Sequence, residues 1–216
     1  MIQVTAFKWV PPFAQGSVRD IRVRWALEEA GLGYDDHLIG FEDQATPEYR
    51  ALQPFGQVPA FSDGKVEMFE SGAIVLYIAG NSDALMPADP AGRAMVMTWL
   101  FAASNSVEPF VGQLAVIDLF HADEAWAKER RPQVETMLRK RLADLQTALG
   151  DRQWFANDRF SAADILMTHV LRDLRHTDIV ADYPALADYV ARAEARPAFK
   201  RALADQLKPF RQHAPA

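Results

Sequence analysis

The sequence predicts an α/β N-terminal domain built on a mixed four-stranded sheet, followed by an all-α C-terminal helical bundle domain. Two observations predict this division. Strand-like and helical segments alternate up to about residue 80, whereas no convincing strand pattern occurs from Arg93 onward. Between them, residues 81–92 contain two prolines and end in glycine, a composition typical of a linker. We therefore expect one domain at residues 1–80, a linker at 81–92 and a helical domain at 93–216.

The N-terminal domain is expected to follow the order strand, helix, strand, helix, two strands and helix. In its first helix, Ile21 and Trp25 have i,i+4 spacing, and Gly31 lies just beyond the helix end. The last two strands form a hairpin that turns at Asp63 and Gly64. Strands are predicted at residues 2–7, 37–39, 58–61 and 66–69, and helices at residues 18–30, 47–52 and 71–79.

The C-terminal domain is expected to contain only helices. Pro109 should bend or interrupt the first of them, because proline removes a backbone donor and clashes with the preceding turn. Ser161 and Asp164 have the spacing of a capping box at a helix start, with Phe160 placed to pack onto Ile165. Helices are predicted at residues 93–120, 123–149, from 161 onward, 184–196 and 197–206.

Composition argues against several classes of function. Of 216 residues, 50% are hydrophobic, so a core can be buried. The net charge of -6 argues against nucleic acid or an anionic membrane as the main partner. No apolar run approaches the roughly 18–20 residues of a membrane span. The N-terminus enters a strand-like pattern without a basic region or cleavage site, so we expect a cytoplasmic protein.

The absence of cysteine bears directly on the chemistry. A chain without cysteine has no disulfide, no thiolate metal site and no cysteine nucleophile, so any thiol must come from the substrate. The histidines show no metal-ligand spacing, and we expect no metal.

Residues 56–71 carry the clearest functional signal. Pro59 stands at the start of a strand, where a cis X-Pro bond would turn the backbone N–H and C=O of Val58 outward toward a ligand. Glu70 and Ser71 stand at a helix start, whose unpaired N–H groups suit a carboxylate. A peptide-like ligand with its carboxylate at Ser71 would use both features. The plainer alternatives are a common Val-Pro strand start and ordinary helix-capping residues.

Together these parts resemble the cytosolic glutathione transferase family, including its bacterial members. Residues 54–61 (Pro-Phe-Gly-Gln-Val-Pro-Ala-Phe) resemble the family segment that contains its cis-proline, and residues 70–74 its glutamate–serine pair. Residues 160–164 resemble the capping box of its buried C-terminal helix, and residues 24–31 fit its first helix. The resemblance covers nearly the whole chain and implies a thioredoxin-like N-terminal domain.

The resemblance implies a binding site for reduced glutathione as co-substrate. Val58, which precedes Pro59, would pair its backbone with the cysteinyl part of glutathione. Ser71 would hold the γ-glutamyl carboxylate, and Glu70 would receive the γ-glutamyl ammonium group. The polar side chain of Gln57 is a further candidate at that end of the site.

The group that activates the thiol departs from the family pattern. A free thiol with a pKa of about 8.5 is mostly protonated at pH 7, and a hydrogen bond donated to the sulfur favours the reactive thiolate. Family members use a Tyr, Ser or Cys between the first strand and the first helix. Here Ser17 occupies the position of the Ser/Cys-type members, and Arg19 stands where these often have Asn. Ser17, Arg19 and a backbone N–H remain open as activators, and Ser17 also fits the role of a helix cap.

Five residues are candidates for a pocket that binds an apolar electrophile. Each of them fits equally well as a core or interface residue. They are Trp9 and Phe13 in the first loop and Phe101, Asn105 and Phe110 in the long helix.

Residues 42–44 are a second departure. They read Glu-Asp-Gln, where many family members place Lys or His against the glycine carboxylate of glutathione. That contact must come from elsewhere, for example from Arg50, or be absent.

The expected function is therefore that of a glutathione transferase, which transfers alkyl or aryl groups and acts in detoxification. It would conjugate the thiolate of reduced glutathione to an apolar electrophile. The alternatives are a glutathione-dependent isomerase or dehalogenase, and a non-catalytic binding or scaffold protein. The resemblance also implies a homodimer, whereas the electrophile itself cannot be identified from the sequence.

Overall fold

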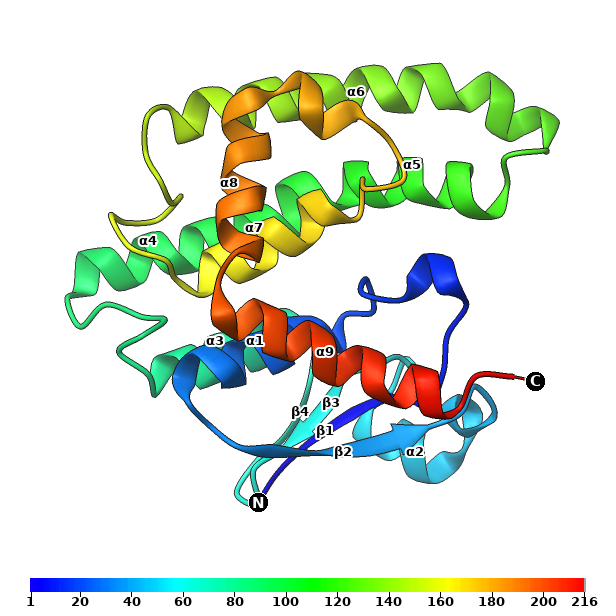
Figure 1. The fold of residues 1–216 in the computed structure, drawn as a ribbon, viewed down its shortest axis with the longest axis vertical. Coiled ribbons are helices and arrows are strands. Elements are labelled where there is room, and N and C mark those ends of the chain that lie inside the picture. The colour runs from blue at the N-terminus through cyan, green and yellow to red at the C-terminus, as the bar shows by residue number, and fades with distance from the viewer. Residues whose placement is uncertain (216) are drawn as a thin grey trace. The chain divides into compact units, whose positions relative to one another are not determined.

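The computed structural model describes residues 1–215, and these form two compact units (Figure 1). The first unit comprises Met1–Pro87 together with the segment from Ala195 onward, and the second unit comprises Ala88–Glu194. All strands of the described residues lie in the first unit, and the second unit is helical. The predicted combination of an α/β part and a helical part is confirmed.

A mixed four-stranded sheet forms the centre of the first unit, with the strand order β2-β1-β3-β4. β1 pairs in parallel with β2 and antiparallel with β3, and β3 pairs antiparallel with β4. The mixed sheet predicted from the sequence is confirmed, although β2 is longer than expected and β3 begins two residues later. The strands are β1 (Ile2–Phe7), β2 (Tyr34–Ile39), β3 (Ala60–Ser62) and β4 (Glu67–Phe69).

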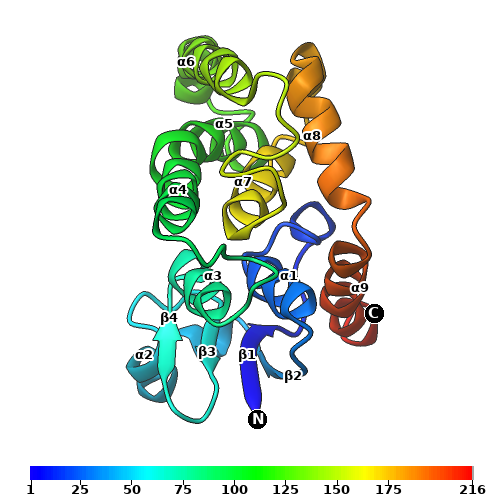
Figure 2. The same ribbon diagram turned by 90° about the vertical axis from the view of Figure 1, so that its left-hand side faces the viewer.

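Helices cover both faces of this sheet: α1 and α3 lie on one face and α2 on the other (Figure 2). Gly31 ends α1 with a φ of 68°, a left-handed conformation that glycine adopts without steric cost. Buried apolar side chains of β1, α1 and α3 form the core between the sheet and these two helices. The helices are α1 (Asp20–Ala30), α2 (Pro47–Leu52) and α3 (Ser71–Gly80), with short 3-10 turns η1 (Pro12–Ala14) and η2 (Glu42–Ala45).

The last helix, α9 (Pro197–Gln212), belongs to the first unit and lies beside α1 (Figure 2). This differs from the predicted helical domain at residues 93–216. The Arg196 guanidinium donates two hydrogen bonds to the Glu29 carboxylate, at 2.6 and 2.7 Å. The rings of Trp25 and Phe199 meet edge to face, with centroids 4.8 Å apart. An amphipathic helix pattern shows that a face must be buried but not which element covers it, so the sequence did not show this placement.

The second unit consists of helices, with a longer loop at residues 150–161. The stretch Pro90–Phe120 is helical throughout, but residues 102–107 are π-helical, directly before the turn that contains Pro109. This agrees with the expectation that Pro109 bends or interrupts the helix. The elements are α4 (Pro90–Phe101), η3 (Ala102–Val107), α5 (Glu108–Phe120), α6 (Ala125–Leu149), α7 (Ala162–Arg172), η4 (Ile179–Asp182) and α8 (Pro184–Glu194).

The stretch Pro90–Phe120 is also long and apolar enough to cross a membrane, judged by length and composition alone. The expectation that no run approaches this length is therefore not met. This is a weak indication, because core helices of soluble proteins pass the same test. Val96, Leu100, Val111 and Leu114 of this stretch are buried in the present structure.

The predicted capping box at the start of α7 is confirmed. The Asp164 carboxylate, which is fully buried, accepts hydrogen bonds from the backbone N–H and the hydroxyl of Ser161. It also accepts from the backbone N–H of Phe155 at 3.1 Å and from the Tyr189 hydroxyl at 3.0 Å. Burial raises the pKa of Asp164, while these four donors oppose the rise. One carboxylate thus connects the loop before α7, the start of α7 and α8.

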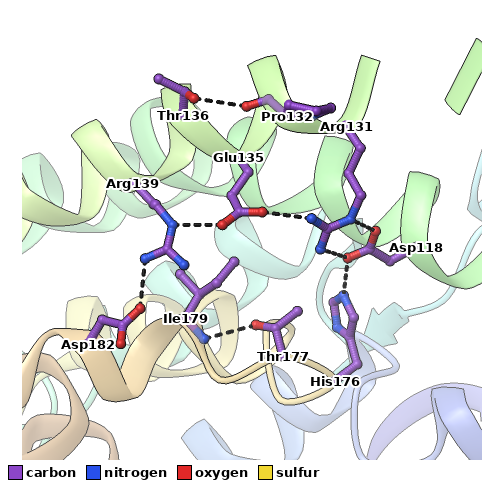
Figure 3. Close-up of polar contacts among 10 residues, drawn as sticks. All are labelled: Asp118, Arg131, Pro132, Glu135, Thr136, Arg139, His176, Thr177, Ile179 and Asp182. Carbon is purple, nitrogen blue, oxygen red and sulfur yellow. Dashed lines mark hydrogen bonds and ion pairs between the residues drawn. The ribbon is translucent and has the colours of Figure 1, made fainter. Parts of the chain in front are cut away.

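A row of ion pairs joins α5, α6 and η4 (Figure 3). Arg131 binds Asp118 through two hydrogen bonds, of 2.6 and 3.0 Å, and binds Glu135 at 2.6 Å. Arg139 binds Glu135 at 2.7 Å and Asp182 at 2.7 Å. Glu135 is therefore shared by two arginines one turn before and one turn after it.

Asp118 and Arg131 also line a pocket of about 540 Å³, between the end of α5, the start of α6 and the turn after α7. His176 lies in the same pocket, and its Nε2 is 3.3 Å from Asp118. Because Asp118 already pairs with the Arg131 guanidinium, the pocket does not present this group as an unpaired positive charge.

We expect Glu135→Gln to lower the free energy of unfolding by about 1 kcal/mol at pH 7, because partly exposed pairs in a network contribute modestly. Hydrogen bonds from Arg139 and Arg131 lower the pKa of Glu135 from its ordinary 4.5. A lowered carboxyl pKa stabilises the fold above pH 4.5, and this contribution is lost as the pH falls through the folded-state value. Urea unfolding at pH 7 and pH 3 should therefore show a difference between wild type and variant that shrinks at pH 3.

Glu129→Gln is the control, because Glu129 is exposed on the same helix and changes the net charge equally. An equal loss in both variants would show that net charge, not the shared carboxylate, is responsible.

Candidate functional site

Three loops meet at one edge of the sheet of the first unit. Val4 is paired with Phe61 across β1 and β3, and Ala60 is paired with Phe69 across β3 and β4. In antiparallel neighbours, the end of one strand lies beside the start of the next. The loop after Phe7, the segment before Ala60 and the segment after Phe69 therefore lie at the same edge.

Val58 has its backbone open at this edge. The Val58–Pro59 peptide bond is cis, and the Val58 side chain is buried in a cluster with Phe7, Tyr49 and Ala60. Within residues 1–215, neither the N–H nor the C=O of Val58 has a backbone hydrogen-bond partner. An extended ligand can pair with these two groups as an added strand would.

The preceding segment is held in place by α2 and η2. The Tyr49 hydroxyl donates to the carbonyl of Gln57, and the Gln44 amide donates to the carbonyl of Gly56, both at 2.5 Å. Arg50 donates from Nη1 to the carbonyl of Pro54 at 2.7 Å. Burial raises the pKa of Tyr49 to about 12, so its hydroxyl keeps the proton that it donates. The side chain of Gln57 is exposed beside this braced backbone.

Gly56 is required at its position. Its φ is 63°, and an added Cβ would lie 2.6 Å from the backbone oxygen of Gln44. A side chain there would meet both an unfavourable backbone conformation and a fixed backbone atom.

The turn into α3 presents the second part of the site. Glu70 precedes α3 with a φ of 71°, in the left-handed region that non-glycine residues seldom adopt, and its side chain is exposed. Ser71 is the first residue of α3, and its hydroxyl oxygen is 3.3 Å from Nη1 of Arg22, which donates to it. The first backbone N–H groups of α3 have no intrahelical acceptor, as at every helix start.

Arg22 is a residue of this site that the sequence interpretation missed. The sequence alone predicts that Arg19, Arg22 and Arg24 form a charged face of the first helix, but Arg22 and Arg24 are buried. The available signal was that Ile21, Val23 and Trp25 alternate with the arginines, so this helix offers no separate polar face.

Ser17 lies in the turn before α1 and is half-buried. Its backbone N–H donates to the carbonyl of Ala14 at 3.0 Å. The alternative role as helix cap is not observed, because α1 starts at Asp20 with Arg19 at the cap position. Arg19 itself is exposed. The role of Ser17 in thiol activation stays a prediction.

Known proteins support the family resemblance. Residues 6–80 match the family described as "Glutathione S-transferase, N-terminal domain", and residues 113–206 match "Glutathione S-transferase, C-terminal domain". The protein named Glutathione S-transferase 3 of Zea mays is 32% identical over 201 residues, which cover 85% of this chain and 88% of that protein. The chain belongs to the glutathione S-transferase family. It is thus a member of a family of transferase enzymes.

Solved structures agree with the membership in the glutathione transferase family. A glutathione transferase from Burkholderia graminis, with two glutathione molecules bound per one protein subunit, is 32% identical. The two structures match with a TM-score of 0.81, over 94% of this chain and 87% of the Burkholderia graminis chain. A glutathione transferase from Pseudomonas putida, with one glutathione disulfide bound per subunit, is 28% identical. This match has a TM-score of 0.82, over 94% of this chain and 90% of the Pseudomonas putida chain.

The five candidates for an electrophile pocket in this glutathione transferase are divided between the two units. In the first unit, Trp9 packs against the cluster around Val58, and Phe13 is 44% exposed in η1. In the second unit, Phe101 and Asn105 are exposed, and the Phe110 ring lies under the guanidinium of Arg141, 5.1 Å away. A pocket shared by these residues stays a prediction.

Two further predictions about ligands can be compared with the described residues. Arg50, the alternative partner for the glycine carboxylate of glutathione, donates from Nη1 to the carbonyl of Pro54. Its contact with the glycine carboxylate stays a prediction. Within residues 1–215, no group of three or more His, Asp or Glu side chains is placed to hold a metal ion.

Proposed function

We propose that this glutathione transferase family member binds reduced glutathione at the sheet edge and transfers its thiolate to an apolar electrophile. The observation that carries the proposal is the pairing of two features at one edge. The open backbone of Val58 fits an extended peptide, and the start of α3 at Ser71 fits a carboxylate. Glutathione combines a peptide-like body with a carboxylate at its γ-glutamyl end.

The Ser71 hydroxyl is oriented for this carboxylate. Arg22 donates a hydrogen bond to Ser71 Oγ, which engages the oxygen as an acceptor and leaves the hydroxyl proton to be donated to the ligand. The partial positive charge at the start of α3 adds to the attraction. The exposed carboxylate of Glu70, one residue earlier, suits the γ-glutamyl ammonium group.

Ser17 is proposed to donate its hydroxyl proton in a hydrogen bond to the glutathione sulfur. The bond favours the thiolate, and the thiol proton passes to solvent. The thiolate then attacks an electrophilic carbon; a C–S bond forms, and the leaving group departs with its bonding electrons. Catalysis of this kind consists mainly of positioning and of thiolate stabilisation.

We expect a calorimetric titration with reduced glutathione to show binding with proton release near pH 7. The titration is run in two buffers of different protonation enthalpy, so that proton release appears as a difference in heat. Ser17→Ala should still bind but release fewer protons, because its bound thiol pKa rises by about one unit, equivalent to about 1.4 kcal/mol. Ser71→Ala should instead weaken binding by roughly tenfold, because it removes a hydrogen bond to a charged group.

S-methylglutathione is the control ligand, because it keeps the peptide and both carboxylates but has no thiol proton. It should bind wild type without proton release. If wild type releases no protons with glutathione either, Ser17 is not an activator and a non-catalytic binding protein becomes the better interpretation. If glutathione does not bind, the proposal fails. Proton release without conjugation of apolar electrophiles would favour a glutathione-dependent isomerase or dehalogenase.

The protein is further proposed to be a cytoplasmic homodimer that acts in detoxification. Met95, Met97 and Phe101 give α4 an exposed apolar surface that a second copy would cover. Light scattering coupled to gel filtration tests the dimer, and a mass near the 24.2 kDa of one chain would contradict it.

A further inference from the structure

The C-terminal helix α9 reaches the start of α1 through one buried side chain. Gln206, which is 1% exposed, donates from Nε2 to the carbonyl of Val18 at 2.9 Å and to the Asp20 carboxylate at 2.6 Å. Both acceptors thus bind the same amide nitrogen. The carbonyl of Val18 also accepts from the backbone N–H of Ile21 at 3.1 Å. The residue that follows Ser17 is therefore held from α1 and from α9 at once.

The anchor for Gln206 is itself fixed. Asp20 is fully buried, and its second oxygen accepts from Nε of Arg24 at 2.7 Å. Nη2 of Arg24 lies 2.7 Å from the carboxylate of Asp36 in β2, an edge strand of the sheet. A buried ion pair with a third partner holds its geometry tightly, because a displaced member would leave a buried charge uncompensated. Gln206 therefore binds to a rigid point on α1 and can hold Val18 in register with it.

The position of the loop between β1 and α1 depends on contacts with other parts of the first unit. Residues 8–19 contain only the short turn η1, and Arg19 does not cap α1 with its side chain. The side chains of Val10 and Val18 pack against the cluster around Val58, and Gln206, 188 residues from Val18 in the sequence, adds a hydrogen bond to the backbone at the end of this loop. A hydroxyl that hydrogen-bonds a thiolate must stay within a few tenths of an ångström of its place.

We infer that Gln206 is a positioning residue of the glutathione site: by holding the backbone at Val18, it fixes the hydroxyl of Ser17 against the glutathione sulfur. This inference rests on the proposed function of Ser17. It makes the C-terminal helix part of the thiol-activating machinery, although Gln206 itself does not touch glutathione.

The chain offers a matched control on the same two helices. Arg196 binds Glu29 near the other end of α1 through two hydrogen bonds, of 2.6 and 2.7 Å. This pair also joins the α9 segment to α1, but it lies about ten residues along α1 from Val18, far from the loop. Loss of either link weakens the attachment of α9, but only loss of Gln206 removes the hydrogen bond to the backbone at Val18.

The test compares Gln206→Met with Arg196→Met in the full chain. Methionine fills nearly the volume of glutamine but has no amide. The pKa of bound glutathione is measured from the absorbance of its thiolate as the pH is varied, and binding without the thiol is measured with S-methylglutathione. In the ligand-free protein, hydrogen–deuterium exchange of residues 13–20 reports on the loop.

Gln206→Met should raise the bound thiol pKa by about one unit and speed exchange in residues 13–20 at least tenfold. Its affinity for S-methylglutathione should change less than twofold, because Val58 and Ser71 are unaffected. Arg196→Met should leave the thiol pKa and loop exchange unchanged, even if it lowers the melting temperature. An unchanged pKa and unchanged exchange in Gln206→Met would overturn the inference, as would equal changes in both variants.

A replacement variant and a measurement without glutathione allow a decision if the first comparison fails. If Gln206→Met does not fold, Gln206→Asn replaces it, because it keeps the amide but is one methylene too short to hold both acceptors. If wild type does not bind glutathione, the proposed function fails by itself, and loop exchange still decides the structural role. Faster exchange in the Gln206 variant alone then supports a hold on the loop, and unchanged exchange overturns it.

Discussion

Asp164→Ala is expected to lower the free energy of unfolding by about 3–5 kcal/mol. The buried carboxylate accepts four hydrogen bonds. Alanine would leave the N–H groups of Phe155 and Ser161 without an acceptor, and the Tyr189 hydroxyl would keep only the backbone carbonyl of residue 164, at 3.3 Å. Each buried donor left unpaired costs about 1–3 kcal/mol. Loss of the cap at α7 adds about 1 kcal/mol. Relaxation and water entry recover part of this sum. Urea unfolding followed by far-ultraviolet circular dichroism measures the loss.

Asp63→Ala is the chemical control for this prediction. Asp63 accepts from two backbone N–H groups, those of Lys65 and Val66, and from the hydroxyl of Tyr77. These donors lower the pKa of Asp63 to about 2, whereas burial raises the pKa of Asp164. Because water can replace a carboxylate at the surface hairpin but not in the core, Asp63→Ala should be far milder. Similar losses in the two variants would contradict a role for burial.

Gly56→Ala is expected to disrupt both the fold of the first unit and the glutathione site. Alanine at a φ of 63° costs about 1–2 kcal/mol. Its Cβ would also lie 2.6 Å from the backbone oxygen of Gln44, so the segment must shift. We expect a total loss of about 2–4 kcal/mol of unfolding free energy. Glutathione affinity should fall at least tenfold, which is about 1.4 kcal/mol, because Val58 is two residues away.

Gly64→Ala separates strain from the clash. Gly64 has a φ of 84°, but an added Cβ would meet no atom within 4 Å. It should therefore lose only the conformational part, and it should keep its affinity for glutathione. Calorimetric titration with glutathione and urea unfolding of both variants supply the comparison. Equal affinity in Gly56→Ala and wild type would show that the braced segment does not position Val58.

Local patterns predicted most of the fold. The alternation of strand and helix, the hairpin at Asp63 and Gly64, and the capping box at Ser161 each depend on residues close in sequence. Such patterns specify an element, and sometimes its end, without reference to the rest of the chain. The placement of Val58 and Ser71 at one sheet edge followed from the short hairpin between them.

Long-range partners could not be predicted in the same way. Arg22 and Arg24 were interpreted as a charged face, because nothing near them in the sequence shows that Ser71 and Asp36 accept from them. The link from Gln206 to Asp20 spans nearly the whole chain. Ser17 was a plausible helix cap by residue type, but α1 begins three residues later, and cap position is set by the loop geometry that precedes it. The predicted linker at residues 81–92 and the electrophile pocket stay predictions.

The return of α9 to α1 makes the first unit discontinuous, with the second unit inserted between its two parts. During synthesis, the second unit has its whole sequence as soon as Glu194 has been added. The first unit has its sheet by then but lacks Phe210, which joins the cluster around Val58, and Gln206. The part of the protein that is made first is therefore the last to be completed, and residues 1–87 alone lack one side of their own core.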